Sequence, residues 1–537
     1  MKIAIAQINC TVGDLTGNVK KIIDATNQAK HLGADLVITP ELALSGYPPK
    51  DLLLRSEFCI ACQNSLTDLI RSVHGITLLV GYPHYTENNV FNAAAVIQNG
   101  RVVATYYKNT LNRSSYFNEH HYFNPGTEPC FFELSGIKFG VNICADFWQE
   151  NLTASHIAYS GIQILLVLNA SAYQIDKQAE RYRITRQHIQ ETEINVIHTN
   201  LVGGQDERVY DGASFVMNSK GALTHQLSEF SETLGLVEIQ GDMPVTGELV
   251  ATPSSIASIY QALCMGVKDY VAKNNFPGAL LGLSGGIDSA LTLAIAVDAL
   301  GADHVQTVMM PSQYTADFSL QDAKELAATC GVRHQECNIQ PLFDHFLTSL
   351  INELHIGSDD ETRLTQENLQ ARIRGVLLMA LSNQTGSLVL TTGNKSEMAV
   401  GYCTLYGDMA GGFAVLKDVS KTMVYQLSHY RNQLSKIIPE RIIQRPPSAE
   451  LRPNQTDQDS LPPYEVIDNI IEAFVEQNLS PAEIIDMNYD PAHVTHVIQL
   501  IRKNEYKRRQ APLGIRITQR DFGTSWHYPI TTKFNEF

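Results

Sequence analysis

Short apolar runs rich in β-branched residues alternate with helix-like patterns from the N-terminus to about residue 221. This alternation is typical of an α/β fold, because buried strands appear as short apolar runs and their covering helices show 3.6-residue periodicity. The expected strands are 2–8, 34–40, 76–82, 92–98, 138–144, 163–170, 194–201 and 213–218. The Asn99-Gly100 pair lies between two such runs and favours a tight hairpin turn. We therefore expect two mixed sheets with helices outside.

A second α/β block begins after a polar stretch. Residues 222–250 show little periodicity, and a helical pattern starts at Pro253, with Ser254 and Ser255 in capping positions. The elements expected beyond it are a strand at 278–283, a helix at 289–300 and strands at 305–310 and 387–392. This order predicts a doubly wound, mostly parallel sheet with a ligand crevice at its strand ends. We expect two domains, 1–250 (core 1–221, linker 222–250) and 251–537, and a proline-rich loop at 445–463.

The composition excludes several classes of function. The 537 residues include 40 Lys and Arg against 56 Asp and Glu, a net charge of −16, and 44% of them are hydrophobic. Extended binding of nucleic acid or anionic membrane needs clustered basic residues, so we expect small-molecule substrates, no nucleic acid and no membrane. The sequence has no signal-peptide pattern and no uninterrupted apolar run of 18 residues, and its nine cysteines are scattered. These features predict a cytoplasmic protein.

Three chemically active side chains follow three of the expected strands. Glu41 comes just after one buried strand, Lys108 follows another, and Cys144 lies where an apolar run ends and polar residues begin. A thiol at a strand-to-helix turn is open to substrate, and nearby positive charge increases its thiolate fraction. An isolated cysteine is more often a buried structural thiol. The three strand ends taken together favour a shared catalytic crevice.

In these segments residues 1–221 resemble the nitrilase superfamily, and in particular the amide-hydrolysing domains of glutamine-dependent ligases. The resemblance implies an αββα sandwich in which Cys144 attacks the glutamine carboxamide and Glu41 acts as the general base. It implies that Lys108 stabilises the oxyanion. The residues that it implies for glutamine binding are Ser114, Ser171 and Lys177.

A glycine-rich loop joins an expected strand directly to an apolar helix. Its residues are Gly282, Leu283, Ser284, Gly285, Gly286, Ile287, Asp288 and Ser289. Adjacent glycines let the backbone approach an anion, and the N–H groups, hydroxyls and helix N-terminus favour phosphate. No lysine follows the last glycine, so this is not a Walker A motif. Asp288 and Glu397 are the expected ligands of Mg²⁺, which binds carboxylates together with phosphate oxygens.

The loop resembles the pyrophosphate loop of the ATP pyrophosphatases, and segments 367–374, 391–397, 406–408 and 505–512 resemble the NAD synthetases. With the nitrilase-like half in front, nearly the whole chain is similar to the glutamine-dependent members of that family. The resemblance implies amidation of deamido-NAD to NAD with ATP, giving AMP and pyrophosphate, with ammonia from glutamine. It implies ATP contact by Thr392, a lid residue Lys417, a homo-oligomer, and deamido-NAD contacts by Asn368, Glu397 and Lys507.

Departures from the family pattern around the first site leave alternatives open. Ser114 replaces a usual tyrosine, Ala145 a usual acidic residue, and Ala172 a frequent proline. They motivate the alternative of an ammonia-dependent synthetase with an impaired glutaminase. Two further alternatives are a nucleotide-binding sensor without turnover and an ATP-pyrophosphatase amidotransferase with a different acceptor carboxylate.

Overall fold

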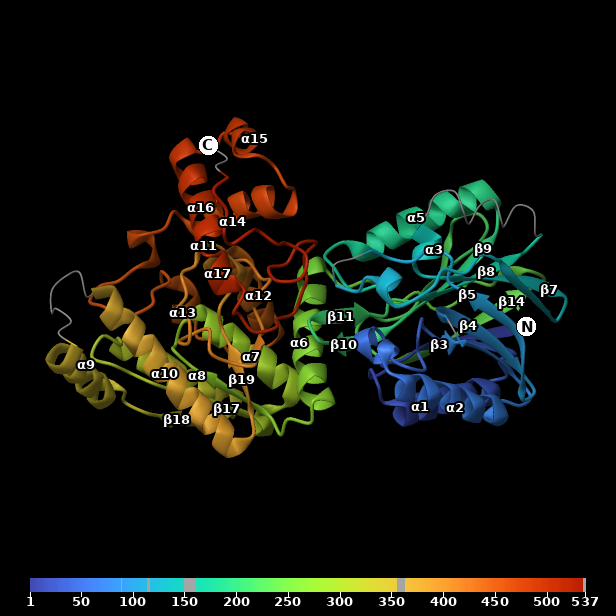
Figure 1. The fold of residues 1–537 in the computed structure, drawn as a ribbon, viewed down its shortest axis with the longest axis horizontal. Helices are drawn as coiled ribbons and strands as arrows, with labels where there is room; N and C mark the ends of the chain where they lie inside the picture. Colours follow the sequence, from blue (N-terminus) through green and yellow to red (C-terminus); the bar gives the residue numbers. More distant parts are fainter. Residues whose placement is uncertain (88, 114–115, 149–160, 355–362, 535–537) are drawn as a thin grey trace. The chain divides into compact units, whose positions relative to one another are not determined.

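The chain forms two compact units, Met1–Ser255 and Ile256–Phe537, each with its own core (Figure 1). The computed structural model describes residues 1–87, 89–113, 116–148, 161–354 and 363–534. No helix in this described part of the chain is both long and apolar enough to span a membrane.

Unit 1 contains two mixed β-sheets within its described residues. The first sheet has the strand order β15-β14-β1-β2-β3-β4-β5, the second has the order β13-β12-β9-β8-β7-β6, and β10 and β11 form a separate hairpin. The strands are β1 (Lys2–Gln7), β2 (Leu36–Ile38), β3 (Thr77–Tyr85), β4 (Val90–Gln98), β5 (Arg101–Tyr107), β6 (Cys130–Leu134), β7 (Ile137–Ile143), β8 (Ile164–Asn169), β9 (Asn195–Asn200), β10 (Val202–Gln205), β11 (Arg208–Asp211), β12 (Phe215–Met217), β13 (Leu223–Gln226), β14 (Thr233–Gln240) and β15 (Met243–Pro244). The helices are α1 (Leu15–His31), η1 (Lys50–Leu54), α2 (Ser56–Ser72), η2 (Glu119–His121), α3 (Ala145–Trp148) and α5 (Lys177–Thr192).

Alternation along β1 shows why these layers form. Ile3 and Ile5 point into an apolar cluster shared by strands of both sheets, while Ala4 and Ala6 join a second cluster with residues of α1 and α2. Successive side chains of a strand point to opposite faces, so a strand covered on both faces is apolar throughout. Helix α5 packs on the outer face of the second sheet through Ile189. The result is the expected αββα sandwich (Figure 1).

The segment expected as a linker at 222–250 is instead part of the sheets. Strand β14 pairs antiparallel with β1 along its length, with Lys2 opposite Glu238 and Gln7 opposite Thr233. Strand β13 pairs with β12, and β15 with β14. The linker expectation was wrong because β14 is stabilised by pairing with a strand more than 200 residues away, which local periodicity does not report.

Unit 2 is built around a parallel sheet with the order β18-β17-β16-β19-β20 in its described residues. Its strands are β16 (Ala279–Gly282), β17 (Val305–Met309), β18 (Arg333–Glu336), β19 (Leu388–Thr391) and β20 (Phe413–Ala414). Its helices are α6 (Ser255–Lys273), α7 (Ile287–Leu300), η3 (Ala302–His304), α8 (Asp317–Cys330), α9 (Gln340–Leu354), α10 (Arg363–Thr385), α11 (Lys395–Val400), α12 (Lys421–Leu434), α13 (Glu440–Gln444), η5 (Asp457–Asp459), α14 (Tyr464–Ile471), η6 (Glu472–Glu476), α15 (Pro481–Asp486), α16 (Pro491–Lys503) and α17 (Glu505–Arg508). The chain winds outward from β16 through β17 to β18, then continues on the other side through β19. This reversal creates a ligand crevice at the carboxyl end of β16, where the glycine-rich loop begins.

Candidate functional site

Cys144 occupies a sharp turn between β7 and α3. Its backbone has φ of +41°, a left-handed conformation that is costly for a residue with a side chain. The Asp146 carboxylate holds this turn, since it accepts hydrogen bonds from the backbone N–H of Ile143 at 3.1 Å and of Thr110 at 2.6 Å, and from the Tyr106 hydroxyl at 2.8 Å. The strained turn is therefore fixed from several sides and presents the thiol at the end of β7.

Glu41 and Lys108 come together beneath this turn. The Lys108 ammonium donates to Glu41 Oε1 at 2.7 Å, and both side chains are almost completely buried. Asn92 Nδ2 also donates to Glu41 Oε1 at 2.8 Å, and the Ala170 N–H donates to Glu41 Oε2 at 3.2 Å. The backbone N–H of Cys144 donates to the Leu168 carbonyl at the end of β8. The thiol lies close enough to Glu41 and Lys108 for their charges to affect its pKa.

A second carboxylate, Glu119, was missed by the sequence reasoning. It is fully buried and accepts from Lys108 Nζ at 2.7 Å, so the ammonium lies between two glutamates. The backbone N–H of Asn112 donates to its other oxygen at 2.7 Å, which ties down the loop between β5 and η2. The sequence signal that could have identified Glu119 was the short spacing, since this acidic residue follows the candidate catalytic Lys108 by eleven positions.

Burial and neighbouring charge set the ionisation of this group. Burial raises the pKa of Glu41, Lys108 opposes that shift, and Glu119 adds to it. Burial lowers the pKa of Lys108, but Glu119 and Glu41 outweigh burial and hold it well above its ordinary value. Burial and the negative charge of Glu41 raise the pKa of the Cys144 thiol, while Lys108 lowers it. Glu41 is thus the carboxylate suited to accept the thiol proton, and Lys108 remains cationic.

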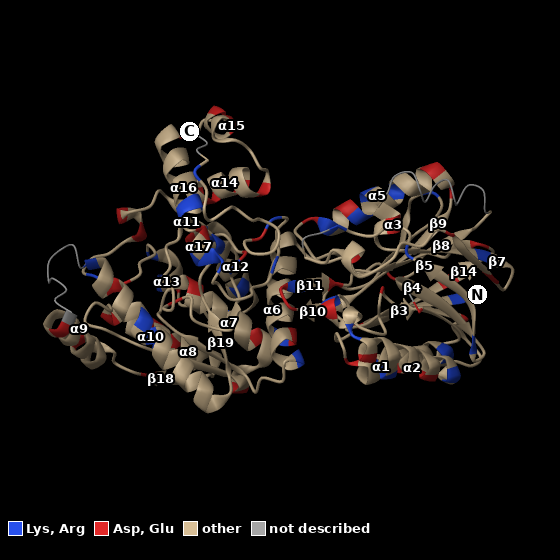
Figure 2. Cartoon of the chain, viewed as in Figure 1, with Lys and Arg blue, Asp and Glu red and all other residues tan. Residues whose placement is uncertain are grey.

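Of the expected glutamine-binding residues, the structure describes Ser171 and Lys177. Ser171 is two residues past β8, and its N–H donates to Asn200 Oδ1 at 2.9 Å. Lys177 begins α5, where basic and acidic residues are interspersed (Figure 2), and pairs with Glu180 at 2.7 Å while lying 4.1 Å from the Trp148 ring centroid. Ser114 lies outside the described residues. Ala145 opens α3, and Ala172 packs against the core of the first sheet.

The glycine-rich loop connects β16 to α7 at the mouth of a cavity of about 280 Å³. Gly285 has φ of +76°, and a Cβ there would lie 2.5 Å from the Ser319 carbonyl oxygen, so only glycine fits. The loop is braced internally by Ser284 and Ser289, whose hydroxyl oxygens are 3.1 Å apart. Of the predicted ATP residues, those that line the cavity are Gly282, Leu283, Ser284, Gly286, Ile287, Asp288, Ser289 and Thr392.

Asp288 and Glu397 converge on one buried cation in this cavity. Lys421 Nζ lies 2.5 Å from Asp288 Oδ2 and 3.1 Å from Glu397 Oε1, and Asn394 Nδ2 donates to Asp288 Oδ1 at 2.8 Å. The sequence reasoning missed Lys421. The sequence signal that could have identified it is its place at the first position of α12, because a cation is unfavourable at a helix N-terminus unless nearby carboxylates compensate.

The two carboxylates fit the ligand chemistry of Mg²⁺, which takes one or two protein carboxylates and completes its shell with phosphate oxygens and water. Asp288 belongs to the phosphate loop, Glu397 lies on α11, and both line the cavity. The described residues contain no cluster of three or more His, Cys, Asp and Glu side chains able to hold a metal without such help. Burial, opposed by Lys421, raises the pKa of Glu397 to about 8.

The proline-rich segment at 445–463, expected as a loop, contributes to the nucleotide cavity. Arg445 Nη2 donates to the Gly285 carbonyl at 2.6 Å, and the residues from this segment that line the cavity are Arg445, Pro446, Pro447, Ser448, Ala449, Glu450, Leu451 and Asp457. Arg374 of α10 also lines it, and burial lowers the pKa of this arginine to about 10. Arg374 lies in the segment 367–374 that resembles the NAD synthetases but was given no role, and Arg445 was missed because it lies far along the chain from the glycine-rich loop.

Three predicted residues of unit 2 lie outside the lining of this cavity. Asn368 Oδ1 accepts from the Thr404 hydroxyl at 2.9 Å, and Thr404 is itself a lining residue. Lys507 Nζ donates to the carbonyls of Gly401 and Cys403, both at 2.8 Å. Lys417, the expected lid residue, donates to the Pro512 carbonyl at 2.7 Å. Through these hydrogen bonds, Lys507 and Lys417 hold backbone carbonyls of unit 2 in place.

Comparison with known proteins accounts for both units. Residues 2–245 match the carbon-nitrogen hydrolase family, and residues 259–511 match the NAD synthase family. The chain is 46% identical over 534 residues to the glutamine-dependent NAD(+) synthetase of Acinetobacter baylyi, covering 98% of each chain. It is 41% identical to that of Aquifex aeolicus, covering 99% of this chain and 100% of the other. The solved structure of the glutamine-dependent NAD+ synthetase from Acinetobacter baumannii with ADP matches with a TM-score of 0.79 at 43% identity, covering 98% of each chain. Since these matches span both units, the chain belongs to the glutamine-dependent NAD(+) synthetase family.

Proposed function

We propose that this protein amidates deamido-NAD to NAD at the expense of ATP, releasing AMP and pyrophosphate, with ammonia from glutamine hydrolysis. The observation that carries the proposal is the presence on one chain of two groups of residues: Glu41, Lys108 and Cys144 in unit 1, and a phosphate loop whose Asp288 lines one cavity with Glu397 in unit 2. Full-length similarity to glutamine-dependent NAD(+) synthetases supports the same reaction.

The first step releases ammonia in unit 1. Glu41 accepts the Cys144 proton as the sulfur attacks the carboxamide carbon, and the resulting oxyanion is stabilised by Lys108 and by the backbone N–H that follows Cys144. The proton held by Glu41 passes to the departing nitrogen, the C–N bond breaks to release ammonia, and the acyl group remains on Cys144 as a thioester. Glu41 then takes a proton from water, whose oxygen attacks the thioester and frees glutamate and the thiol. Ser114, Ser171 and Lys177 are the proposed contacts of the amino-acid end of glutamine.

The second step activates and amidates the acceptor in unit 2. The nicotinate carboxylate of deamido-NAD attacks the α-phosphorus of ATP and expels pyrophosphate, which the N–H groups of the loop 282–289 hold. Ammonia then attacks the acyl carbon and displaces AMP, giving the carboxamide of NAD. Arg374 and Arg445 offset negative charge in the cavity, and a bound Mg²⁺, held by Asp288 and Glu397, would neutralise phosphate charge. We assign ATP contact to Thr392 and deamido-NAD contact to Asn368, Glu397 and Lys507.

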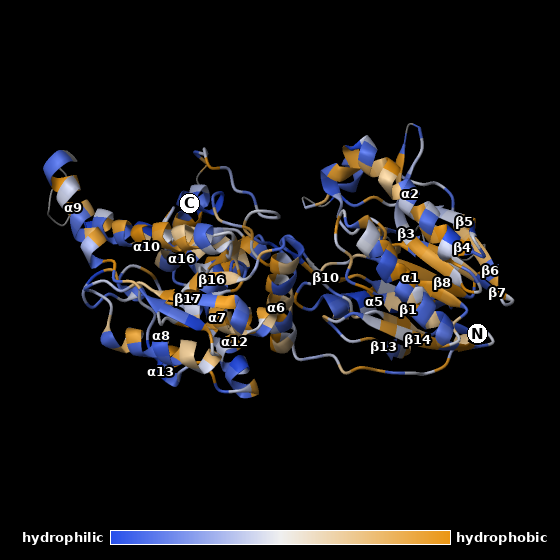
Figure 3. Ribbon diagram, turned by 90° about the horizontal axis from the view of Figure 1, so that it is seen from below, coloured by the Kyte–Doolittle hydropathy of each residue, from blue (hydrophilic) through white to orange (hydrophobic). Residues whose placement is uncertain are grey.

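We also propose that the protein is a homo-oligomer in the cytoplasm. Large apolar side chains are exposed on α9 and α10, where Figure 3 marks hydrophobic segments; they are Leu342, Phe346, Leu364, Val376 and Met379. Exposed apolar side chains of this size support contact with a second copy. All nine cysteines lie in the described residues and none forms a disulfide there, which supports a reducing compartment. Light scattering of the protein and of Val376→Glu tests the assembly.

One assay tests the function. Purified protein is incubated with ATP, Mg²⁺, deamido-NAD and either glutamine or ammonium, and NAD and AMP are measured. We expect NAD from both nitrogen sources, with Cys144→Ala losing only the glutamine-driven reaction. Activity with ammonium alone in the unmutated protein would indicate an impaired glutaminase, and no NAD from either source would refute the proposal.

A further inference from the structure

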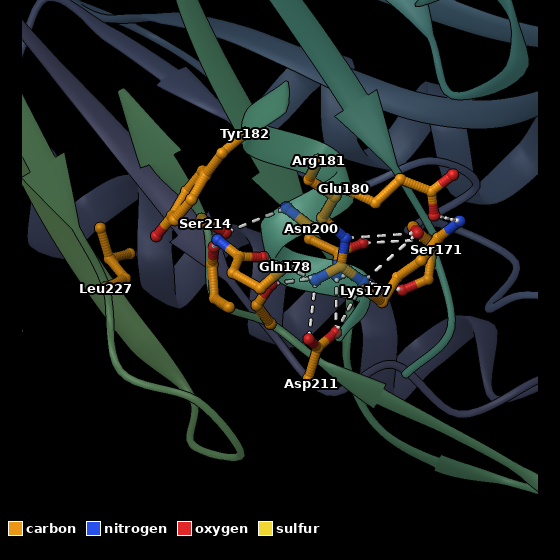
Figure 4. Close-up of polar contacts among 12 residues, drawn as sticks. Ser171, Lys177, Gln178, Glu180, Arg181, Tyr182, Asn200, Asp211, Ser214 and Leu227 are labelled. Atoms are coloured by element: carbon orange, nitrogen blue, oxygen red, sulfur yellow. Dashed lines mark hydrogen bonds and ion pairs between the residues drawn. The ribbon is translucent and has the colours of Figure 1, made fainter. Parts of the chain in front are cut away.

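A buried arginine beside the first site has no part in the mechanism above. Arg181 lies one helical turn after Lys177 on α5, and it is only 1% exposed. Both of its terminal nitrogens face the Asp211 carboxylate, with Nη1 donating to Oδ2 at 2.7 Å and Nη2 to Oδ1 at 2.9 Å (Figure 4). Gln178 Oε1 accepts a further bond from Nη1 at 2.9 Å. This paired geometry compensates for burial of the charge and fixes the guanidinium plane.

The rest of the guanidinium is directed at Ser171. Nη2 donates to the Ser171 carbonyl at 2.8 Å, and Nη2 and Nε face its hydroxyl oxygen at 3.3 and 3.4 Å (Figure 4). Asn200 Nδ2 donates to the same carbonyl at 3.2 Å and to Asp211 Oδ1 at 3.2 Å. The backbone and side chain of Ser171 are therefore held by one rigid polar network.

This network decides what the Ser171 hydroxyl can offer. A hydroxyl has one hydrogen to donate and lone pairs that accept. The lone pairs of Ser171 face donors of Arg181, a group that has no acceptor, so the hydrogen must point elsewhere. No described residue accepts a hydrogen bond from this hydroxyl, whereas its oxygen accepts from Arg181. The hydrogen is thus available to an acceptor on a bound ligand.

We propose that Arg181 is a positioning residue that makes Ser171 an obligatory hydrogen-bond donor to the α-carboxylate of glutamine. This inference rests on the proposed function and names the recognition chemistry at its glutamine site. Lys177, four residues earlier on the same helix, supplies positive charge to the same carboxylate. A substrate whose α-carboxylate is replaced by a carboxamide carries one acceptor oxygen instead of two and no charge, and so binds less well.

The test uses Arg181→Lys, which keeps the charge beside Asp211 but loses the planar fork, together with Ser171→Ala and the double variant. Arg183→Lys is the matched control, because Arg183 is exposed on the same helix. We expect Arg181→Lys and Ser171→Ala each to raise KM for glutamine about 10- to 100-fold, as for loss of a hydrogen bond to a charged group. The kcat of the glutamine-driven reaction and the ammonium-driven rate stay within about threefold of the unmutated values.

The double variant separates positioning from general support of the fold. If Arg181 acts through the Ser171 hydroxyl, the double variant has the KM of Ser171→Ala alone, because that hydroxyl is already absent. The proposal would be overturned if the KM increases of the two single variants multiply in the double variant. It would also be overturned if Arg181→Lys lowers kcat and leaves KM unchanged. Should Arg181→Lys not fold, Ser171→Ala alone decides: its preference for glutamine over glutamine α-amide must shrink at least fivefold, and an unchanged preference overturns the inference. Absence of NAD synthesis by the unmutated protein would instead refute the proposed function.

Discussion

The ammonium nitrogen of Lys108 lies 2.7 Å from Glu41 Oε1 and the same distance from an oxygen of Glu119. All three side chains are buried, so two carboxylates share one cation where little water screens them. The arrangement fixes the position of the lysine nitrogen, which we propose stabilises the oxyanion. It also means that the charge of Glu119 affects both neighbours.

Glu119→Gln tests the need for the second carboxylate. The amide keeps the shape of the side chain but has one acceptor oxygen in place of two, so it loses a hydrogen bond from either Lys108 or Asn112 together with the negative charge that holds Lys108 in place. We expect the glutamine-driven rate to fall by about 100-fold, while the ammonium-driven rate is unchanged because unit 2 is not touched. Glu133→Gln, at an exposed position on β6, serves as the control. A near-normal glutamine-driven rate in Glu119→Gln would show that Glu41 alone is enough to hold Lys108 in its working position.

The same variant predicts a shift in pH dependence. Burial raises the pKa of Glu41 above its usual 4.5, and Glu119 raises it further. Protonated Glu41 cannot accept the thiol proton, so kcat/KM for glutamine rises with pH through this raised pKa. Removing the Glu119 charge lowers the pKa of Glu41 and moves the acid limb to lower pH. The pH–rate profiles of the two proteins, with ammonium-driven synthesis as the reference, measure the shift. An acid limb that moves to higher pH in the variant would show that a group other than Glu41 controls it.

Lys421→Met tests the charge balance of the nucleotide cavity. Without the ammonium, Asp288 and Glu397 remain as partly buried, unpaired carboxylates, a loss of about 3–5 kcal/mol. We expect a clearly lower melting temperature, and millimolar Mg²⁺ should raise that temperature more in the variant than in the unmutated protein. Lys436→Met, at an exposed position, is the control. Equal effects of Mg²⁺ on the variant and the unmutated protein would count against a metal site between these carboxylates.

Gly285→Ala tests the phosphate loop against a matched glycine. Both Gly285 and Gly301 have positive φ, +76° and +83°, so alanine at either costs about 1–3 kcal/mol of backbone strain. Only at Gly285 does the added Cβ meet a backbone oxygen, at 2.5 Å. We expect Gly285→Ala to abolish NAD synthesis from both nitrogen sources, while Gly301→Ala lowers stability alone. Isothermal titration with ATP and the two activity assays check this, and ATP binding by Gly285→Ala would contradict it.

Much of the fold follows from local pattern. The strands expected at 2–8, 76–82 and 163–170 correspond to β1, β3 and β8, because a strand buried on both faces is recognisable by its own residues. β18 was missed because its residues, RHQE, are polar and mostly exposed at the edge of the sheet. Strand β14 was missed because its stability comes from pairing with β1.

The sequence by itself determined that a thiol, a carboxylate and an amine follow separate strands, and that a glycine-rich turn joins a strand to a helix. Those features depend on residue type and on side-chain periods that are local. Only the tertiary structure decided that Glu119 shares Lys108 with Glu41, that Lys421 bridges carboxylates 133 and 24 positions away, and that Arg181 faces Ser171 and Asp211. Such contacts depend on which segments pack together, and no local period along the chain encodes that choice.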